Sequence, residues 1–548
     1  MNRLRLWRGA KHVSGEARPI SRWRGLPRTA CSTLLALSAG LALITAGLLS
    51  ACTASSEHPC PTTLDAVRDH VVQLVDAGEI PSMVVAVSWH GKPYWEEAFG
   101  WANREERIPA TVDTRYALAS VSKPLTATAF MILVDRGLFS LEDPVNAHLG
   151  ENGLRSAVAD ADGVTFRQVA SHTAGLPLHC QTFYVDEPFL PPSFDETIRR
   201  YGFLATAPGE RYQYSNLGYG ILGHLIGQLS GGTYAEFLRD EVLDPLGMEQ
   251  TTVGLDPNLA ESYAVSYTGN GEAIPTALTD CPGSAGLYGT ASDLIRFARF
   301  HMGVPSPDQR AILSEASRRE MQTVSPGTVP TRNWECPGSG YGLGWFVGFT
   351  ADGLRIIDHS GGTHGVSTIL ILIPEEELAV VALSNASGPW PEAIGIEIVS
   401  ALIPERLAHL CTPKPSDPAT AFSDAEPNLV GRWSGSVSTY EGNVPISLQI
   451  DDSEDARITL GDAEQVQLRD VTYTDRMPVL NNAGGGPFLR GWFESDFGTE
   501  DVRRGCPCKR WLELKLRDQR LTGSLITFSQ RLHYTGPLSH WVELTRAP

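Results

Sequence analysis

The tetrapeptide Ser120-Val121-Ser122-Lys123 stands at the start of an apolar, helix-like stretch over residues 125–138. A serine and a lysine three positions apart at a helix start lie on the same face, one turn from each other. Burial would lower the pKa of this lysine, so that Lys123 could take the proton of the Ser120 hydroxyl. The helix N-terminus would add N–H donors beside the nucleophile. The alternative interpretation is an ordinary N-cap serine followed by an exposed lysine.

Two further motifs would complete a hydrolytic site. Tyr214-Ser215-Asn216 offers a phenol, whose phenolate a neighbouring lysine cation would favour, and an amide that can donate to a substrate carbonyl. His359-Ser360-Gly361-Gly362 follows a strand-like run, and its small residues would let a substrate approach the strand edge. The N–H groups of Ser120 and Gly362 could then form an oxyanion hole. Taken singly, the Tyr214-Ser215-Asn216 motif could be an ordinary surface loop, and the His359–Gly362 motif could be a glycine-rich hairpin.

In this order, the three motifs resemble those of the penicillin-recognising serine hydrolases, which include class C β-lactamases, D-alanyl-D-alanine peptidases and related esterases. Residues 138–145, 164–176, 286–294 and 341–345 also resemble blocks of that family. The resemblance spans residues 63–405 or so. It implies an α/β fold in which an antiparallel sheet is flanked by helices, with the site between this sheet and a helical lobe.

The resemblance also implies a role for each residue. Ser120 becomes the acylated nucleophile, Lys123 and Tyr214 share the general-base work, and Tyr214 later activates the deacylating water. The residues that orient the substrate or hold the oxyanion are Asn216, His359, Ser360, Gly361 and Gly362. Class C β-lactamases carry Lys-Thr-Gly where this chain carries His359-Ser360-Gly361. This departure weakens the expectation of a cationic clamp for a carboxylate, because histidine is only partly charged near neutral pH. We interpret His172 as structural.

The first 51 residues are typical of a secretory signal, since a basic stretch precedes the nearly uncharged residues 32–51. They end in Leu49-Ser50-Ala51-Cys52, which resembles a bacterial lipobox. We therefore predict a signal peptide over 1–51, lipidation of Cys52 and a tether over 52–62. The body would lie in the cell envelope, anchored to a bacterial membrane on its extracytoplasmic side. An uncleaved signal anchor is the alternative, because about 20 apolar residues can just span a bilayer.

The net charge and the spacing of possible ligand residues limit which partners the chain can have. Without residues 1–51, the chain has 36 basic and 62 acidic residues and a net charge of −26, which disfavours nucleic acid. No metal-ligand spacing, phosphate loop or dinucleotide fingerprint is convincing, so neither a metal nor a cofactor is predicted.

Once Cys31 has left with the signal and Cys52 is lipidated, seven cysteines remain, and this odd count leaves at least one without an intrachain partner. They are Cys60, Cys180, Cys281, Cys336, Cys411, Cys506 and Cys508.

Composition divides the body of the chain. A hydrolase domain is predicted over 63–411, with a helix over 63–77 and strands over 83–89, 94–101, 354–359, 367–373 and 378–383. A Pro-rich linker follows over 412–428, and residues 429–548 form a C-terminal domain. Alternating patterns there predict about seven or eight short strands, one of them over 466–474, in an all-β barrel or sandwich. Gly431-Arg432-Trp433 resembles the opening of lipocalin-like barrels, and Trp433 is expected to plug the core.

These features predict a serine hydrolase that acts through an acyl-enzyme on an ester or amide. It would be an esterase or D-amino-acid peptidase with at most weak β-lactamase activity, and its substrate would be a small molecule or derived from the cell wall. Two alternatives stay open. One is a cell-envelope binding or regulatory protein with little turnover. The other is ligand binding by the C-terminal barrel.

Overall fold

The computed structural model describes residues 63–328, 336, 338–407, 429–451, 456–477, 482–495, 498–530 and 536–547. The predicted signal peptide, Cys52, the tether and the linker lie outside the described residues, as do Cys60 and Cys411. In the described part of the chain, no helix combines the length and the apolar character needed to cross a membrane.

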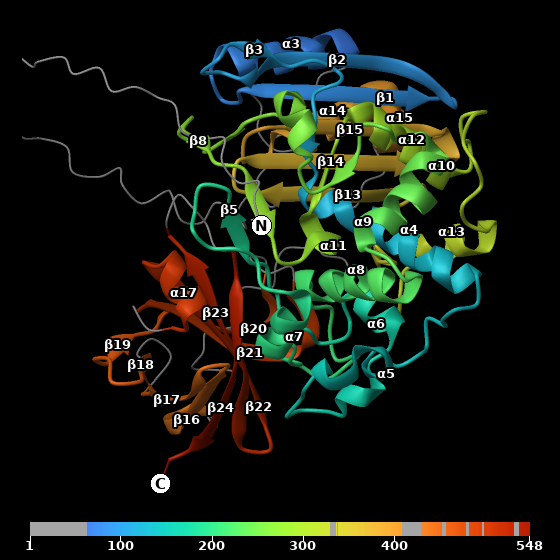
Figure 1. The fold of residues 1–548 in the computed structure, drawn as a ribbon. Coiled ribbons are helices and arrows are strands. Elements are labelled where there is room, and N and C mark those ends of the chain that lie inside the picture. Colours follow the sequence, from blue (N-terminus) through green and yellow to red (C-terminus); the bar gives the residue numbers. More distant parts are fainter. Residues whose placement is uncertain are drawn as a thin grey trace, which may run out of the picture. The chain divides into compact units, whose positions relative to one another are not determined.

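An eight-stranded antiparallel sheet joins the two ends of the predicted hydrolase domain (Figure 1). Its strand order is β11-β12-β13-β14-β15-β1-β2-β3. The first strand of the domain pairs with the last, and Val85 lies opposite Ala382. The bounds are β1 Ser82–Trp89, β2 Lys92–Asn103, β3 Ile108–Pro109, β11 Gly340–Tyr341, β12 Phe346–Phe349, β13 Arg355–Thr363, β14 Val366–Ile373 and β15 Leu378–Ser384. The predicted antiparallel sheet is confirmed, and β13 extends through the His-Ser-Gly-Gly motif.

Helices cover both faces of this sheet. On one face lie α3 (Leu64–Asp76) and α14 (Trp390–Leu402), and on the other lies α12 (Ala291–Met302) (Figure 1). Alternate residues of β1 serve the two faces, since successive strand side chains point in opposite directions. Val85 joins the core under α3 and α14, whereas Val84 joins the core of the helical lobe. The predicted helix over 63–77 is confirmed as α3.

A helical lobe follows the first strands, and its two central helices are α4 and α8. Both are apolar on nearly all sides, which is typical of helices buried in a core. The helices of the lobe are α4 Ser122–Asp135, α5 Asn146–Leu149, α6 Phe166–Ala170, α7 Phe194–Tyr201, α8 Asn216–Ser230, α9 Tyr234–Leu238, α10 Asp244–Leu246, α11 Pro282–Ala285 and α13 Glu315–Met321. The 3-10 turn η1 (Ala119–Val121) precedes α4, and the short strands β5 (Thr182–Tyr184) and β9 (Ala277–Thr279) pair with each other.

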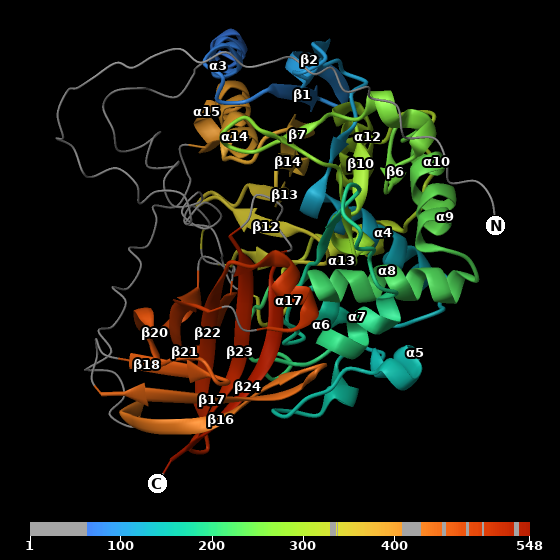
Figure 2. The same cartoon turned by 60° about the vertical axis from the view of Figure 1, so that its left-hand side comes forward.

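The C-terminal domain is one nine-stranded antiparallel sheet with the order β19-β18-β17-β16-β24-β23-β22-β21-β20 (Figure 2). Leu468 alone separates the edge strands β19 and β20 in the chain, so the two edges meet in a nearly closed barrel. The bounds are β16 Gly431–Thr439, β17 Gly442–Ile450, β18 Ala456–Leu460, β19 Val466–Gln467, β20 Arg469–Met477, β21 Asn482–Glu494, β22 Cys508–Arg517, β23 Arg520–Ser529 and β24 Leu538–Arg546, with α17 at Glu500–Gly505.

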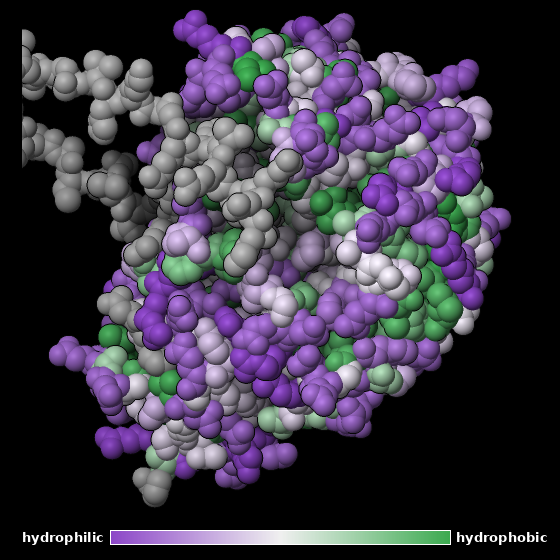
Figure 3. Space-filling view, in the orientation of Figure 1, coloured by the Kyte–Doolittle hydropathy of each residue, from purple (hydrophilic) through white to green (hydrophobic). Residues whose placement is uncertain are grey.

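The sequence left a barrel and a sandwich open for this domain, and this topology is that of a barrel. Trp433 is 1% exposed and donates its Nε1–H to the Leu429 carbonyl at 2.8 Å, so it plugs the core as expected. The single strand predicted over 466–474 is wrong, because Leu468 interrupts it. The surface is largely hydrophilic on the face that Figure 3 shows, in line with the high charge of the chain.

The C-terminal domain contacts the loop before α8 through buried charges. Arg211 donates to both carboxylate oxygens of Glu513, at 3.1 and 2.7 Å, and Arg490 pairs with the same carboxylate at 2.8 Å. These three side chains are at most 3% exposed. Lys515 and Arg517 of the barrel also pair with Glu210. The barrel therefore holds this loop at Arg211, which lies only three residues before Tyr214 in the sequence.

Removing the charge of Glu513 should loosen this contact. Burial opposes its ionisation, but the charges of Arg211 and Arg490 outweigh burial and lower the pKa of Glu513 from 4.5 to about 2. Because the folded-state pKa is depressed, this stabilisation is present at neutral pH and is lost as the pH falls from 4.5 towards 2. We expect Glu513→Gln to lower the free energy of unfolding by about 3–5 kcal/mol at pH 7, measured by urea denaturation.

The matched control for this variant is Glu543→Gln in the same barrel. Its partner Arg520 is 59% exposed, so the change should cost less than about 1 kcal/mol. Equal losses in the two variants would contradict a special role for the buried cluster.

Candidate active site

Ser120 and Lys123 come together as the spacing predicts. Ser120 lies in η1 and Lys123 in the first turn of α4, and Lys123 Nζ donates to Ser120 Oγ at 3.1 Å. Two further oxygens accept from the ammonium: Asn216 Oδ1 at 2.8 Å and the Ser284 carbonyl at 3.0 Å. Lys123 is 0% exposed, so the alternative of an exposed lysine is wrong.

The environment of Lys123 favours its uncharged form. Burial lowers its pKa from 10.5 to about 7, because an ammonium removed from water loses its hydration. Its hydrogen-bond acceptors in the described part of the chain are a hydroxyl, an amide and a backbone carbonyl, none of which carries the negative charge that would restore the pKa. Near neutral pH, a substantial share of Lys123 can therefore accept a proton from Ser120.

Tyr214 lies beside this pair as a neutral phenol. Nζ of Lys123 is 4.8 Å from the centroid of the Tyr214 ring. Burial raises the pKa of Tyr214, and a hydrogen bond with the Ser120 side chain only partly opposes that shift. The expectation that the neighbouring lysine favours the phenolate is therefore wrong for the resting site, because desolvation of the phenolate dominates.

His172 fixes the loop that carries Tyr214. Its Nδ1 accepts the Ser215 N–H at 3.1 Å, and its backbone carbonyl accepts the Gln213 N–H at 2.8 Å. The two rings of His172 and Tyr214 lie with centroids 4.3 Å apart. Burial lowers the pKa of His172 well below its usual value, so the ring is neutral. These contacts agree with the structural role that the sequence analysis assigns to it.

The third motif forms the end of β13 rather than a hairpin loop. In the described chain, β12 reaches along β13 only as far as Asp358, and the following residues of β13 contact η1. A Cβ on Gly361 would lie 2.4 Å from the Leu118 carbonyl oxygen and 3.1 Å from the Ser120 nitrogen. At the exposed Gly362, an added Cβ would meet nothing within 4 Å. Gly361 thus lets the strand approach Ser120, while Gly362 borders open space.

His359 belongs to the wall of the site. The ring is 1% exposed, its Nε2 is 3.0 Å from the Tyr341 hydroxyl, and its Nδ1 is 2.7 Å from the Ser360 carbonyl. A buried imidazole therefore stands where class C β-lactamases have the lysine of Lys-Thr-Gly. This placement gives the described site no exposed cation at the position of that lysine.

Three groups that support the site were not predicted from the sequence. The Ser284 carbonyl holds Lys123 through its backbone, which no side-chain pattern reveals. Tyr341 lies inside the block over 341–345 that resembles the family, but its bond to His359 depends on the folded chain. Arg211 lies in the same sequence stretch as Tyr214. Its charge was the one feature of the sequence that could have indicated a buried acidic partner, which the structure shows to be Glu513.

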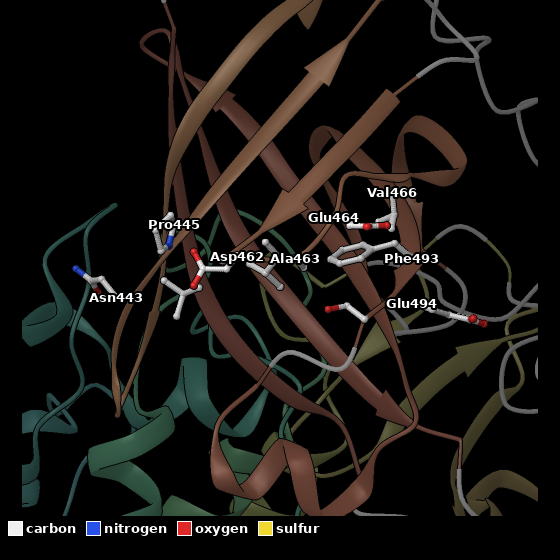
Figure 4. A pocket seen from close by; sticks show the side chains of 12 residues that line it. Asn443, Pro445, Asp462, Ala463, Glu464, Val466, Phe493 and Glu494 are labelled. Atoms are coloured by element: carbon white, nitrogen blue, oxygen red, sulfur yellow. The ribbon is translucent and has the colours of Figure 1, made fainter.

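The C-terminal domain has a cavity of its own, with a volume of about 600 Å³. Figure 4 shows side chains that line it, and all of them belong to residues 443–495. Three carboxylates, from Asp462, Glu464 and Glu494, lie beside the apolar side chains of Val466 and Phe493. Since Trp433 and its neighbours fill the core of the barrel, this cavity is the part of the domain to which the ligand-binding alternative applies.

The sheet, the helical lobe and the Ser-x-x-Lys serine beside a tyrosine define a class, the penicillin-recognising serine hydrolases. Comparison with known families agrees with this class. The model of the beta-lactamase family matches residues 67–402, and the chain belongs to this family of serine hydrolases.

Individual relatives are distant. Penicillin-binding protein 4* of Bacillus subtilis (strain 168) is 28% identical over 320 residues, which cover 54% of this chain and 66% of the relative. Penicillin-binding protein 4 of Amycolatopsis lactamdurans is 30% identical over 365 residues, which cover 62% of this chain and 91% of the relative. The chain thus spans just under two thirds of the first relative and nearly all of the second.

Among solved structures, the octameric penicillin-binding protein homologue from Pyrococcus abyssi matches with a TM-score of 0.54 and 22% identity. The match covers 87% of this chain and 99% of that chain, so it extends beyond the hydrolase domain into the barrel. At this identity, the likeness shows the fold alone.

A methyl group at Gly361 should damage the site. Gly361→Ala would force β13 away from the Leu118 carbonyl and the Ser120 N–H, and so misplace the oxyanion donors. We expect Ser120 to be labelled by a serine-reactive phosphonate about 10²–10³-fold more slowly, the size of effect seen when an oxyanion donor is lost. Gly163→Ala is the control, because its Cβ would meet nothing within 4 Å. Unchanged labelling of a folded Gly361→Ala protein would contradict this geometry.

Proposed function

We propose that this protein hydrolyses an ester or amide through an acyl-enzyme on Ser120. The observation that carries the proposal is the buried Lys123, whose Nζ lies 3.1 Å from Ser120 Oγ and whose pKa is lowered to about 7. A binding protein has no need of a base with this pKa beside a serine, since perturbed groups of this kind are typical of catalytic sites.

The geometry supports a definite order of proton transfers. Neutral Lys123 takes the proton of Ser120 as Oγ attacks the substrate carbonyl, and the N–H groups of Ser120 and Gly362 stabilise the oxyanion. The phenol of Tyr214 then donates its proton to the leaving group and regains one from Lys123. In the second half of the cycle, water gives a proton to Tyr214 as Tyr214 passes its own to neutral Lys123, and the hydroxide attacks the acyl carbon. The bond between the acyl carbon and Ser120 Oγ then breaks, and Lys123 returns the proton to Oγ.

The third motif bears on the substrate class. A buried His359, bonded to Tyr341, replaces the lysine that would reach a free carboxylate. We therefore favour an esterase or a D-amino-acid peptidase with at most weak β-lactamase activity. The names of the two penicillin-binding relatives support a small-molecule or cell-wall-derived substrate.

The location completes the proposal. The signal-like residues 1–51 and the lipobox before Cys52 support a lipid anchor on a bacterial membrane, with the body on the extracytoplasmic side. The acidic body supports the absence of a nucleic acid partner.

A second candidate function is ligand binding by the C-terminal barrel. The observation that favours it is the cavity of about 600 Å³, in which carboxylates stand beside Val466 and Phe493. These groups suit an apolar ligand with a cationic end.

Hydrolysis of a short p-nitrophenyl ester, beside a chromogenic cephalosporin, tests the proposal. We expect Ser120→Ala to abolish turnover, because it removes the nucleophile. Tyr214→Phe should slow acylation by about 10²–10⁴-fold, because it removes the proton donor. Mass spectrometry after a serine-reactive phosphonate should place the label on Ser120.

Tyr94→Phe serves as the control, since Tyr94 is 54% exposed and should be dispensable. Turnover that survives in both site variants would refute the assignment. A folded protein without turnover or label on any probe would favour the binding-protein alternative.

A further inference from the structure

Two thiols lie opposite each other on neighbouring segments beside the active site. β5 and β9 pair antiparallel, with Thr182 opposite Thr279. Continuing this register by two residues places Cys180 opposite Cys281. The backbone follows that register, because Asp280 N–H donates to the Gln181 carbonyl at 3.1 Å. Both cysteines are thiols in this structure.

The hydrogen-bond pattern shows which kind of strand pair they form. Asp280 donates to Gln181 and Val185 donates to Thr276, each at 3.1 Å, so these are the hydrogen-bonded pairs. Because the two kinds of pair alternate along the strands, the next pair beyond Gln181 and Asp280, that of Cys180 and Cys281, falls at a non-hydrogen-bonded position. Cα atoms in such pairs are about 4.5 Å apart with both side chains on one face. That separation lies within the range of about 4.4–6.8 Å that a disulfide spans.

Each cysteine belongs to a segment that holds a catalytic group. Cys281 directly precedes α11, whose Ser284 carbonyl accepts from Lys123, and Ser284 Oγ donates to the Cys281 carbonyl at 2.8 Å. Three residues before Cys180, the Pro177 carbonyl accepts from Ser215 Oγ at 2.8 Å, next to Tyr214. A bond between the two cysteines would therefore connect the support of Lys123 to the support of Tyr214.

The barrel takes part in the same junction. Cys180 N–H donates to the Pro537 carbonyl at 3.1 Å, and a Cβ on Gly536 would lie only 2.0 Å from the Cys180 carbonyl oxygen. Ser539 Oγ donates to the Leu178 carbonyl at 2.8 Å. The segment around Cys180 is thus held between the barrel and the Tyr214 loop.

We propose that Cys180 and Cys281 form a disulfide that ties these segments together and keeps Lys123 and Tyr214 in place. The oxidant is a second disulfide, that of an exported thiol–disulfide oxidoreductase. A thiolate of Cys180 attacks it to form a mixed disulfide, and Cys281 displaces the other thiol. The two cysteines lose two electrons and two protons in total, and the oxidant gains them as two thiols.

Other cysteines of the described chain are already paired. Cys506 bonds to Cys508, and Cys336 is also in a disulfide. Cys180 and Cys281 are the remaining thiols of that part. Burial raises the pKa of both thiols, that of Cys180 to about 11, so few thiolates are present in the folded protein. Thiol–disulfide exchange is therefore slow after folding, and the Cys180–Cys281 bond forms while the chain folds.

A metal ion is the rival occupant of this cluster. Ligand atoms of His179, Asp280 and Cys281 lie within 4.8 Å of one another. However, one oxygen of Asp280 already accepts the Gln181 N–H at 2.9 Å, and the other is 2.7 Å from His179 Nε2. Both oxygens of Asp280 and the Nε2 of His179 are thus already engaged with each other or with the backbone, and the opposed thiols favour the disulfide.

Peptide mapping of the full chain without reducing agent, after unfolding and refolding in oxidised glutathione, tests the proposal and needs no catalysis. We expect a peptide pair that joins Cys180 to Cys281 and separates on reduction. In Cys180→Ala, Cys281 should instead react with iodoacetamide after unfolding. If both cysteines are alkylated in the oxidised wild-type protein, or if zinc binds stoichiometrically while both stay thiols, the proposal is wrong.

The functional consequence is tested with Cys180→Ala/Cys281→Ala. We expect the midpoint of thermal unfolding to fall by about 5–10 °C. Phosphonate labelling of Ser120 should slow by about tenfold or more, because the catalytic groups lose their alignment. The control Cys506→Ala/Cys508→Ala should keep the cross-link and the labelling rate. If the first double variant matches wild type in both measurements, the bond does not support the site.

Discussion

The burial of one ammonium group sets the conditions for the rest of the site. Lys123 is fully buried, and oxygens of Ser120, Asn216 and Ser284 surround it without any negative charge among them. A charged lysine in such a place is unfavourable unless its pKa falls, and that fall makes it a base near neutral pH. The structure must therefore exclude water from Lys123 while leaving Ser120 and Gly362 beside open space.

Segments far apart in the sequence meet that requirement together. Asn216 begins α8, Ser284 lies in α11, and Gly361 brings β13 against η1, the turn that carries Ser120. The barrel adds a buried ion cluster, in which Glu513 holds Arg211 on the Tyr214 loop. The C-terminal domain is therefore part of the support of the site, which gives a physical reason why both domains occur in one chain.

Local signals in the sequence were enough for much of this. Thr63 predicted the start of α3, alternation predicted most barrel strands, and the spacing of Ser120 and Lys123 predicted their contact. Effects of the folded environment could not be read in this way. The pKa of Tyr214 depends on burial from all sides, and Glu513 stands 302 residues after its partner Arg211. Leu468, which splits one predicted strand, matters only because the sheet curls back on itself.

The most direct test of the account is the titration of Lys123 itself. NMR of protein labelled with ¹³C in its lysine side chains would follow this group, and the Lys123→Arg variant would assign its signal. The account predicts a titration midpoint near pH 7. A midpoint at the ordinary lysine value of 10.5 would contradict it, because Lys123 would then be charged at neutral pH and could not serve as the base.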